Sequence, residues 1–166
     1  MKRILSLVVL ILGVSLIAGG NYTFDTGKTA RDEVRAGLAQ EKVVTGEDAS
    51  VPNAPVVDGR TAKVQAETIL KHTLKATNGK MYAEMKRDDP ARATAASGAA
   101  LRMGLMMAYG FDTLSSKTMG AGTALTSAGW VLLAALGLFW LLSVVWSFVG
   151  RQLHLRRLRT RPVSSL

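Results

Sequence analysis

Apolar residues gather at the two ends of this chain of 166 residues, while its middle is polar and only locally patterned. The longest apolar run covers residues 130–149, twenty residues without a charge. A helix of that length rises about 30 Å, the thickness of the hydrocarbon core of a bilayer. The pattern therefore predicts a C-terminal transmembrane helix within residues 122–150, followed by a tail at residues 151–166.

A second apolar run covers residues 4–18 and follows two cations, Lys2 and Arg3. One interpretation is a secretory signal peptide, because the small residues at 18–20 offer a cleavage point. The other is an uncleaved transmembrane helix, or signal anchor, over residues 1–20. We expect the helix to be retained, with Gly13 and Ser15 as the small residues that permit close helix packing.

The polar middle divides into two predicted segments. Residues 21–59 are predicted to be an extracytoplasmic linker, with a possible short helix at 29–41 and prolines at positions 52 and 55. Residues 60–121 are predicted to be an extracytoplasmic or interfacial helical segment. Its clearest helix covers residues 61–77 and is expected to stop at Asn78 and Gly79, which tolerate the left-handed conformation. Its apolar stripe consists of Ala62, Ala66, Ile69, Leu70 and Leu74.

A single amphipathic helix cannot bury its own stripe, so residues 61–77 must dock on a neighbour, on the membrane surface or on another chain. Asp89 and Pro90 then form a suitable N-cap and first helical position. The helical pattern that follows, up to residue 112, is interrupted by Arg102 and Asp112. We expect this segment to lie along the outer interface or against a partner rather than to span the membrane.

These elements together predict an all-α membrane protein. Two transmembrane helices flank an extracytoplasmic segment of short amphipathic helices, which has no large core of its own. Cations before the first apolar run and after the last place both termini in the cytoplasm, in the plasma membrane. The arginines of the tail are expected to contact anionic lipid head groups: Arg151, Arg156, Arg157, Arg159 and Arg161.

Small and aromatic residues mark two further features of the C-terminal apolar run. Gly120, Ala124 and Ala128 recur every four residues, which indicates either a close helix–helix contact or simply low steric bulk. Trp130 and Trp146 suit the two interfacial belts of a membrane, about 24 Å apart by helical rise.

The net charge of +9 does not predict nucleic-acid binding, because its sources are local. The two N-terminal cations and the five tail arginines account for seven charges, and the remaining 14 cations lie beside all 12 acids. There is no cysteine, and the two histidines, His72 and His154, are expected on opposite sides of the membrane. No catalytic or nucleotide-binding motif is present. We therefore expect no metal, no cofactor and no enzymatic activity.

A set of positions in the segment from about residue 40 to 145 matches the common pattern of a known protein family: Gln65, Ala66, Ile69, His72, Leu74, Thr77, Gly79, Lys80, Tyr82, Ala83, Glu84, Arg87, Asp89, Pro90, Arg92, Leu101, Arg102, Met119, Gly120 and Gly122. On these positions the segment resembles a family of small actinobacterial two-helix membrane proteins. The resemblance implies an extracytoplasmic segment and no established activity. Family members often carry the label of an aromatic ring-opening dioxygenase subunit, but such an enzyme needs converging histidine and carboxylate ligands.

These observations lead us to expect an accessory or scaffold subunit of a larger membrane complex, with other membrane subunits and lipids as its partners. A respiratory assembly is one candidate, suggested by lineage alone, and a homo-oligomer is also compatible with the pattern. The alternatives are a cell-envelope or lipid-associated binding protein and a ring-opening dioxygenase component.

Overall fold

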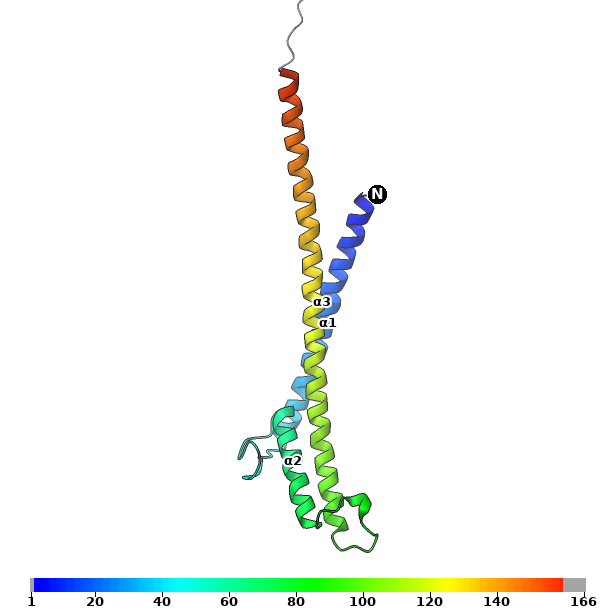
Figure 1. Ribbon diagram of the computed structural model, residues 1–166, viewed down its shortest axis with the longest axis vertical. Helices are drawn as coiled ribbons and strands as arrows, with labels where there is room; N and C mark the ends of the chain where they lie inside the picture. The colour runs from blue at the N-terminus through cyan, green and yellow to red at the C-terminus, as the bar shows by residue number, and fades with distance from the viewer. Residues whose placement is uncertain (1, 160–166) are drawn as a thin grey trace, which may run out of the picture. The chain divides into compact units, whose positions relative to one another are not determined.

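The computed structural model describes residues 2–159, with side chains for residues 3–151. Figure 1 shows that these residues form helices joined by loops, and no strand occurs among them. The all-α class is therefore confirmed. Two helical segments, Arg3–Gln40 and Arg92–Arg151, are long and apolar enough to cross a membrane. In chain order the elements are α1 (Lys2–Gln40), α2 (Gly59–Ala76), the 3₁₀ turn η1 (Tyr82–Glu84) and α3 (Arg92–Arg159).

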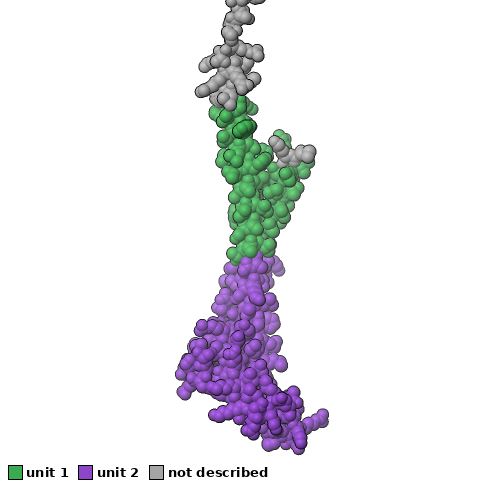
Figure 2. All heavy atoms as spheres, viewed as in Figure 1, with its two compact units in different colours: residues 1–21, 123–166 green, residues 22–122 purple. Residues whose placement is uncertain are grey.

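The chain divides into two compact units, coloured separately in Figure 2. Unit 1 consists of residues 1–21 and 123–166, and unit 2 consists of residues 22–122. The long helices α1 and α3 each contribute residues to both units. Unit 1 contains both apolar runs of the sequence, and unit 2 contains α2 and the loops around it.

The first helix does not end near Gly20, as the sequence predicted, but continues without interruption to Gln40. Residues 21–40 are therefore helical, and the expected linker is confined to residues 41–58. An ion pair one turn apart, Lys28 to Asp32 at 2.8 Å, supports the added turns. Val34 and Leu38 are partly buried along one side of these turns. Such packing outweighs the weak helix propensity of the glycines in α1.

No break in secondary structure accompanies the predicted boundary at residues 121 and 122, because α3 is one helix of 68 residues. The positions of the prolines explain why α3 is continuous. None lies between Pro90 and Pro162, so no proline interrupts the backbone hydrogen bonds of the helix. The helix begins at Arg92 rather than at Pro90. Asp89 accepts a hydrogen bond from the amide of Ala91 at 2.9 Å, in the turn just before the helix.

The sequence predicted α2 closely. Its N-cap is Asp58, whose carboxylate accepts the amide of Thr61 at 2.8 Å, while the hydroxyl of Thr61 accepts the Asp58 amide at 3.2 Å. At the other end Asn78 and Gly79 have φ values of 50° and 81°, and the Gly79 amide donates to Leu74 O at 2.7 Å. Both predicted stop residues therefore take the left-handed conformation.

Unit 2 has a small core. Its buried apolar residues come from the loop before α2, from α2 itself and from the chain around the start of α3: Val56, Ala62, Ala66, Met85 and Ala95. The loop at residues 41–58 contains no helix, but it is ordered by hydrogen bonds around buried Thr45, which bonds to Ala54 through its amide and its hydroxyl, each at 2.9 Å. Neighbours in the same chain thus bury Ala62 and Ala66 of the α2 stripe, while Ile69, Leu70 and Leu74 are partly exposed.

Candidate functional site

The small-residue row predicted as a helix contact is exposed. Gly120, Ala124 and Ala128 all lie on the open side of α3, and a Cβ atom added at Gly120 would meet nothing within 4 Å. Among the described residues this row therefore packs against no other helix of the chain. Contact between the row and a second protein stays a prediction.

The close helix contacts use other glycines. In unit 1 a Cβ atom on Gly129 would lie 2.6 Å from the carbonyl oxygen of Gly13, and one on Gly13 would lie 2.7 Å from Leu133. In unit 2 a Cβ atom on Gly27 would lie 2.9 Å from the carbonyl oxygen of Ser115. At Gly129 and Gly27 the nearby atoms include backbone oxygens, so only glycine fits there. Gly13 is buried in the same close contact as Gly129, as expected. Ser15, named with it, is exposed.

A heptad spacing of small residues could have revealed these contacts. On α1 the glycines recur every seven residues, and on α3 one serine and two glycines do the same. A seven-residue period marks a helix face that stays against its partner over many turns. The row predicted from the sequence had a period of four and selected the opposite side of α3. The buried small residues are Gly13, Gly20, Gly27, Ser115, Gly122 and Gly129.

The predicted membrane anchors lie on the surface of unit 1. Trp130 and Trp146 are both exposed, as is Arg151. Trp140 stacks edge-to-face on Phe139, with 6.3 Å between the ring centroids. The side chains of Arg156, Arg157 and Arg159 lie outside the described residues, as does Arg161 altogether.

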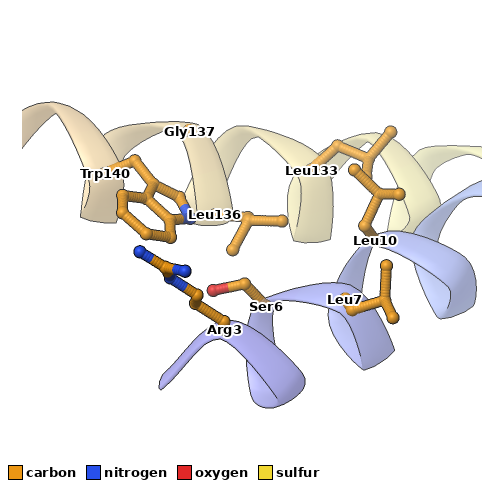
Figure 3. A pocket seen from close by; sticks show the side chains of 8 residues that line it. All are labelled: Arg3, Ser6, Leu7, Leu10, Leu133, Leu136, Gly137 and Trp140. Atoms are coloured by element: carbon orange, nitrogen blue, oxygen red, sulfur yellow. The ribbon is translucent and has the colours of Figure 1, made fainter. Parts of the chain in front are cut away.

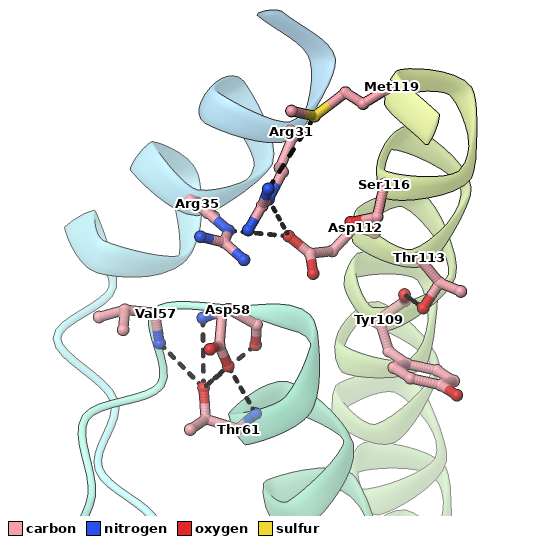
Figure 4. Close-up of polar contacts among 10 residues, drawn as sticks. All are labelled: Arg31, Arg35, Val57, Asp58, Thr61, Tyr109, Asp112, Thr113, Ser116 and Met119. Carbon is pink, nitrogen blue, oxygen red and sulfur yellow. Dashed lines mark hydrogen bonds and ion pairs between the residues drawn. The ribbon is translucent and has the colours of Figure 1, made fainter. Parts of the chain in front are cut away.

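Unit 2 holds an ion-pair cluster that the sequence did not predict. Figure 4 shows the guanidinium groups of Arg31 and Arg35, from α1, directed at the carboxylate of Asp112 on α3. The Arg35 Nε donates to Asp112 Oδ1 at 2.9 Å, and the Arg31 Nε lies 3.8 Å from the same oxygen. That hydrogen bond raises the pKa of Arg35. Asp112, an exception in the apolar pattern of the sequence, therefore faces inward and ties α3 to α1.

His72, a position that matches the family pattern, joins a second, exposed cluster. Its Nε2 lies 3.0 Å from both carboxylate oxygens of Asp48, and the Lys71 ammonium lies 2.7 Å from Oδ2. Hydrogen bonds from Lys71 and His72 lower the pKa of Asp48 to about 2. The expected place of His72 on the polar flank of its helix is confirmed. Asp48 belongs to the loop, and Lys71 and His72 belong to α2, so the cluster joins the loop to α2. All three side chains are exposed, so the contact lies at the surface.

A groove of about 530 Å³ opens between α2 and the start of α3. It is lined by His72 and Thr73 on one side and by Thr94, Ser97 and Leu101 on the other. Within the part of the chain that the structure describes, no group of three or more histidine and acidic side chains is placed to hold a metal ion. The groove offers hydroxyl groups and an imidazole for hydrogen bonding.

An exposed apolar stripe runs along α3 in unit 2. It consists of Met103, Met107, Gly110 and Leu114, spaced by four, three and four residues, and the three large side chains are each more than half exposed. A Cβ atom on Gly110 would meet nothing within 4 Å. This spacing keeps the four residues on one face of a helix. Lys117 continues the stripe and has no ion-pair partner among the described residues.

No family model, no curated protein and no solved structure matches this chain. The resemblance to small actinobacterial membrane proteins therefore stays a prediction.

Proposed function

We propose that this protein is an integral membrane protein, anchored by the apolar segments of α1 and α3, that serves as a non-enzymatic accessory or scaffold subunit of a larger membrane assembly. The observation that carries the proposal is the uncovered apolar surface. In the most apolar window of α3 no residue is buried, and in that of α1 only 11% of residues are buried. The core helix of a water-soluble protein buries such a window.

Lipid acyl chains would contact the exposed apolar side chains of unit 1. Residues 4–24 carry no charge, and as a helix they rise about 30 Å, which matches the hydrocarbon core. A helix also satisfies its own backbone hydrogen bonds, as a segment in lipid must. The cations at both ends of the chain support cytoplasmic termini, with unit 2 on the outer side.

A bilayer is too thin to cover all the exposed apolar surface of α3. The uncharged segment at residues 118–150 alone would rise about 50 Å. The stripe of Met103, Met107, Gly110 and Leu114 begins before this segment, beyond Lys117. We therefore assign the stripe to a helix of another membrane subunit, packed at coiled-coil spacing. The charge of Lys117 favours a partner with a carboxylate at that level.

The membrane location is tested first by extraction. The protein should stay in the membrane pellet after an alkaline wash and should be released by detergent. Single cysteines at Ser50 and Ser164 then report topology, because the chain has no native cysteine. An impermeant thiol reagent added to intact cells should label Ser50→Cys alone. Release by the alkaline wash, or labelling of Ser164→Cys alone, would contradict the proposal.

The subunit role is tested by copurification in mild detergent followed by mass spectrometry. The wild-type chain should bring down stoichiometric membrane proteins. The double variant Met103→Gln/Met107→Gln should lose them at least tenfold, because it places amides in an apolar contact. Met81→Gln is the matched control, an exposed methionine in unit 2 outside the stripe. Equal recovery of partners by the double variant and the control would remove the stripe as a partner surface.

The non-enzymatic role has its own test, since the alternative is a ring-opening dioxygenase component. Such an enzyme binds iron through imidazole and carboxylate ligands. We expect far less than one iron per chain in the purified protein, and an unchanged assembly in His72→Ala. Stoichiometric iron that is lost on this substitution would favour the dioxygenase alternative instead.

A further inference from the structure

A cleft of about 540 Å³ lies between α1 and α3 in unit 1. It opens beyond the tight contact of Gly13 with Gly129, where the two helices separate toward the start of α1. Its lining is apolar except at one end. There, Figure 3 shows the guanidinium group of Arg3 beside the indole of Trp140, with the hydroxyl of Ser6 nearby. At the other end Leu7, Leu10 and Leu133 line the cleft.

Arg3 has no acidic side chain in its unit to pair with. Residues 1–21 and 123–166 contain no aspartate or glutamate, and their charged side chains are all cations. The guanidinium must therefore meet solvent or an anion from another molecule. Guanidinium groups bind phosphate through paired, charge-assisted hydrogen bonds, which makes a phosphate the best-matched anion.

The position of Arg3 along α1 sets the level of that anion. It directly precedes the uncharged residues 4–24, whose helical rise matches the hydrocarbon core. Arg3 therefore lies at the level of the lipid head groups when α1 spans a bilayer, and the indole of Trp140 lines the same end of the cleft. From there the leucine-lined part of the cleft runs toward the middle of the hydrocarbon.

We infer that this cleft binds one anionic phospholipid, with its phosphate on Arg3 and an acyl chain along Leu136, Leu133, Leu7 and Leu10. The volume lies within the range of specific ligand pockets. The inference rests on the proposed membrane location and deepens it, because it assigns one lipid to one site. A free phosphate shares the head-group chemistry but leaves the apolar part of the cleft empty.

The test is native mass spectrometry of the full-length, delipidated protein in detergent, with equal amounts of phosphatidylglycerol and phosphatidylcholine. We expect one retained phosphatidylglycerol per chain, favoured about tenfold over phosphatidylcholine, which is the ratio that a single charge-assisted contact can give. Arg3→Gln should remove this preference. Arg151→Gln should keep it, because Arg151 lies outside the cleft and is only one of five tail arginines expected to attract head groups. Excess inorganic phosphate should not displace the lipid.

A second pair of variants tests the acyl part of the cleft. Gly137 lines the cleft, and a Cβ atom there would meet nothing within 4 Å, so Gly137→Leu fills the cleft without disturbing the helix pair. It should lower lipid retention about tenfold. Gly150→Leu is the matched control, because Gly150 is equally open and lies outside the cleft. Circular dichroism verifies that all four variants fold.

Three results would overturn the inference: equal retention by Arg3→Gln and Arg151→Gln, unchanged retention by Gly137→Leu, or displacement by inorganic phosphate. The first indicates general attraction to basic residues, and the other two indicate an anion site without an acyl chain. Each leaves the proposed membrane location intact, since that location is judged separately by alkaline extraction.

Discussion

Unit 1 and unit 2 are built on the same two long helices, yet they bury different chemistry. In unit 2 the helices are joined by ion pairs from Arg31 and Arg35 to Asp112, and a capped third helix packs beside them. In unit 1 there is no acid, the helices meet through glycines, and the large apolar side chains point outward. The backbone of each helix is continuous across the two units. The difference between the units lies in the side chains and in what they contact.

The largest effect is expected where unit 1 is tightest. In Gly129→Leu the new side chain would overlap the Gly13 carbonyl oxygen and Ile17, each 2.6 Å from the added Cβ atom. Forcing the backbones apart should lower the free energy of unfolding by about 3 kcal/mol, measured by denaturant titration in detergent. Gly120→Leu is the control, because its Cβ atom meets nothing. Equal losses in both variants would show that glycine contacts do not hold unit 1 together.

Gly120→Leu also sharpens the comparison, because Gly120 belongs to the row with Ala124 and Ala128. A variant that keeps its fold but loses its copurifying partners would assign this row to a contact with another protein. Retained partners would leave the row as low steric bulk on the open side of α3.

The second-largest effect on stability is expected at the ion-pair cluster of unit 2. Asp112→Asn keeps the shape of the side chain but leaves Arg31 and Arg35 without their carboxylate. Because the Asp112 side chain is only 13% exposed, we expect a loss of about 2 kcal/mol in the free energy of unfolding. The control is Asp32→Asn, whose pair with Lys28 is solvent-exposed and worth little. A smaller loss in Asp112→Asn than in the control would contradict the role of the cluster.

The third effect concerns the start of α2. Asp58→Ala removes the side chain that accepts the Thr61 amide, and loss of such a cap costs about 1 kcal/mol. The helix content of α2 and the thermal midpoint of unit 2 should both fall. Glu67→Ala on the same helix serves as control, since its pair with Lys63 is 3.9 Å long and exposed. Hydrogen exchange of the α2 amides should be faster in Asp58→Ala than in Glu67→Ala.

The smallest effect is pH-dependent. The pKa of Asp48 is lowered from 3.8 to about 2 by Lys71 and His72. The stabilisation from its ionised form is therefore present above about pH 4 and is lost as the pH falls through 2. An NMR titration of the Asp48 carboxyl carbon should give a midpoint near 2, and Lys71→Met should move it upward. A midpoint near 4 in the wild-type chain would mean that the loop is not fastened to α2.

Local patterns predicted the helical elements well where the chain carries explicit start and stop residues. Asn78 and Gly79 end α2 as expected, because this stop depends on neighbours in sequence, whereas the N-cap Asp58 was not predicted and α2 begins two residues before the expected start. The end of α1 was predicted wrongly and the continuity of α3 was not predicted, because hydropathy changes at Gly20 and near residue 121 while both helices continue. A change from apolar to polar surroundings requires no break in backbone hydrogen bonding.

The sequence by itself determined the all-α class, two helices apolar enough to span a membrane, the stop of α2 and the cations at both ends. Only the tertiary structure decided which small residues touch, since the period-four row and the period-seven glycines lie on different sides of α3. It also decided that Asp112 faces two arginines about 80 residues earlier in the chain, and that Arg3 lies at one end of the cleft between α1 and α3. These pairings depend on how two distant helices align, and no local rule of hydrogen bonding or hydropathy fixes that alignment.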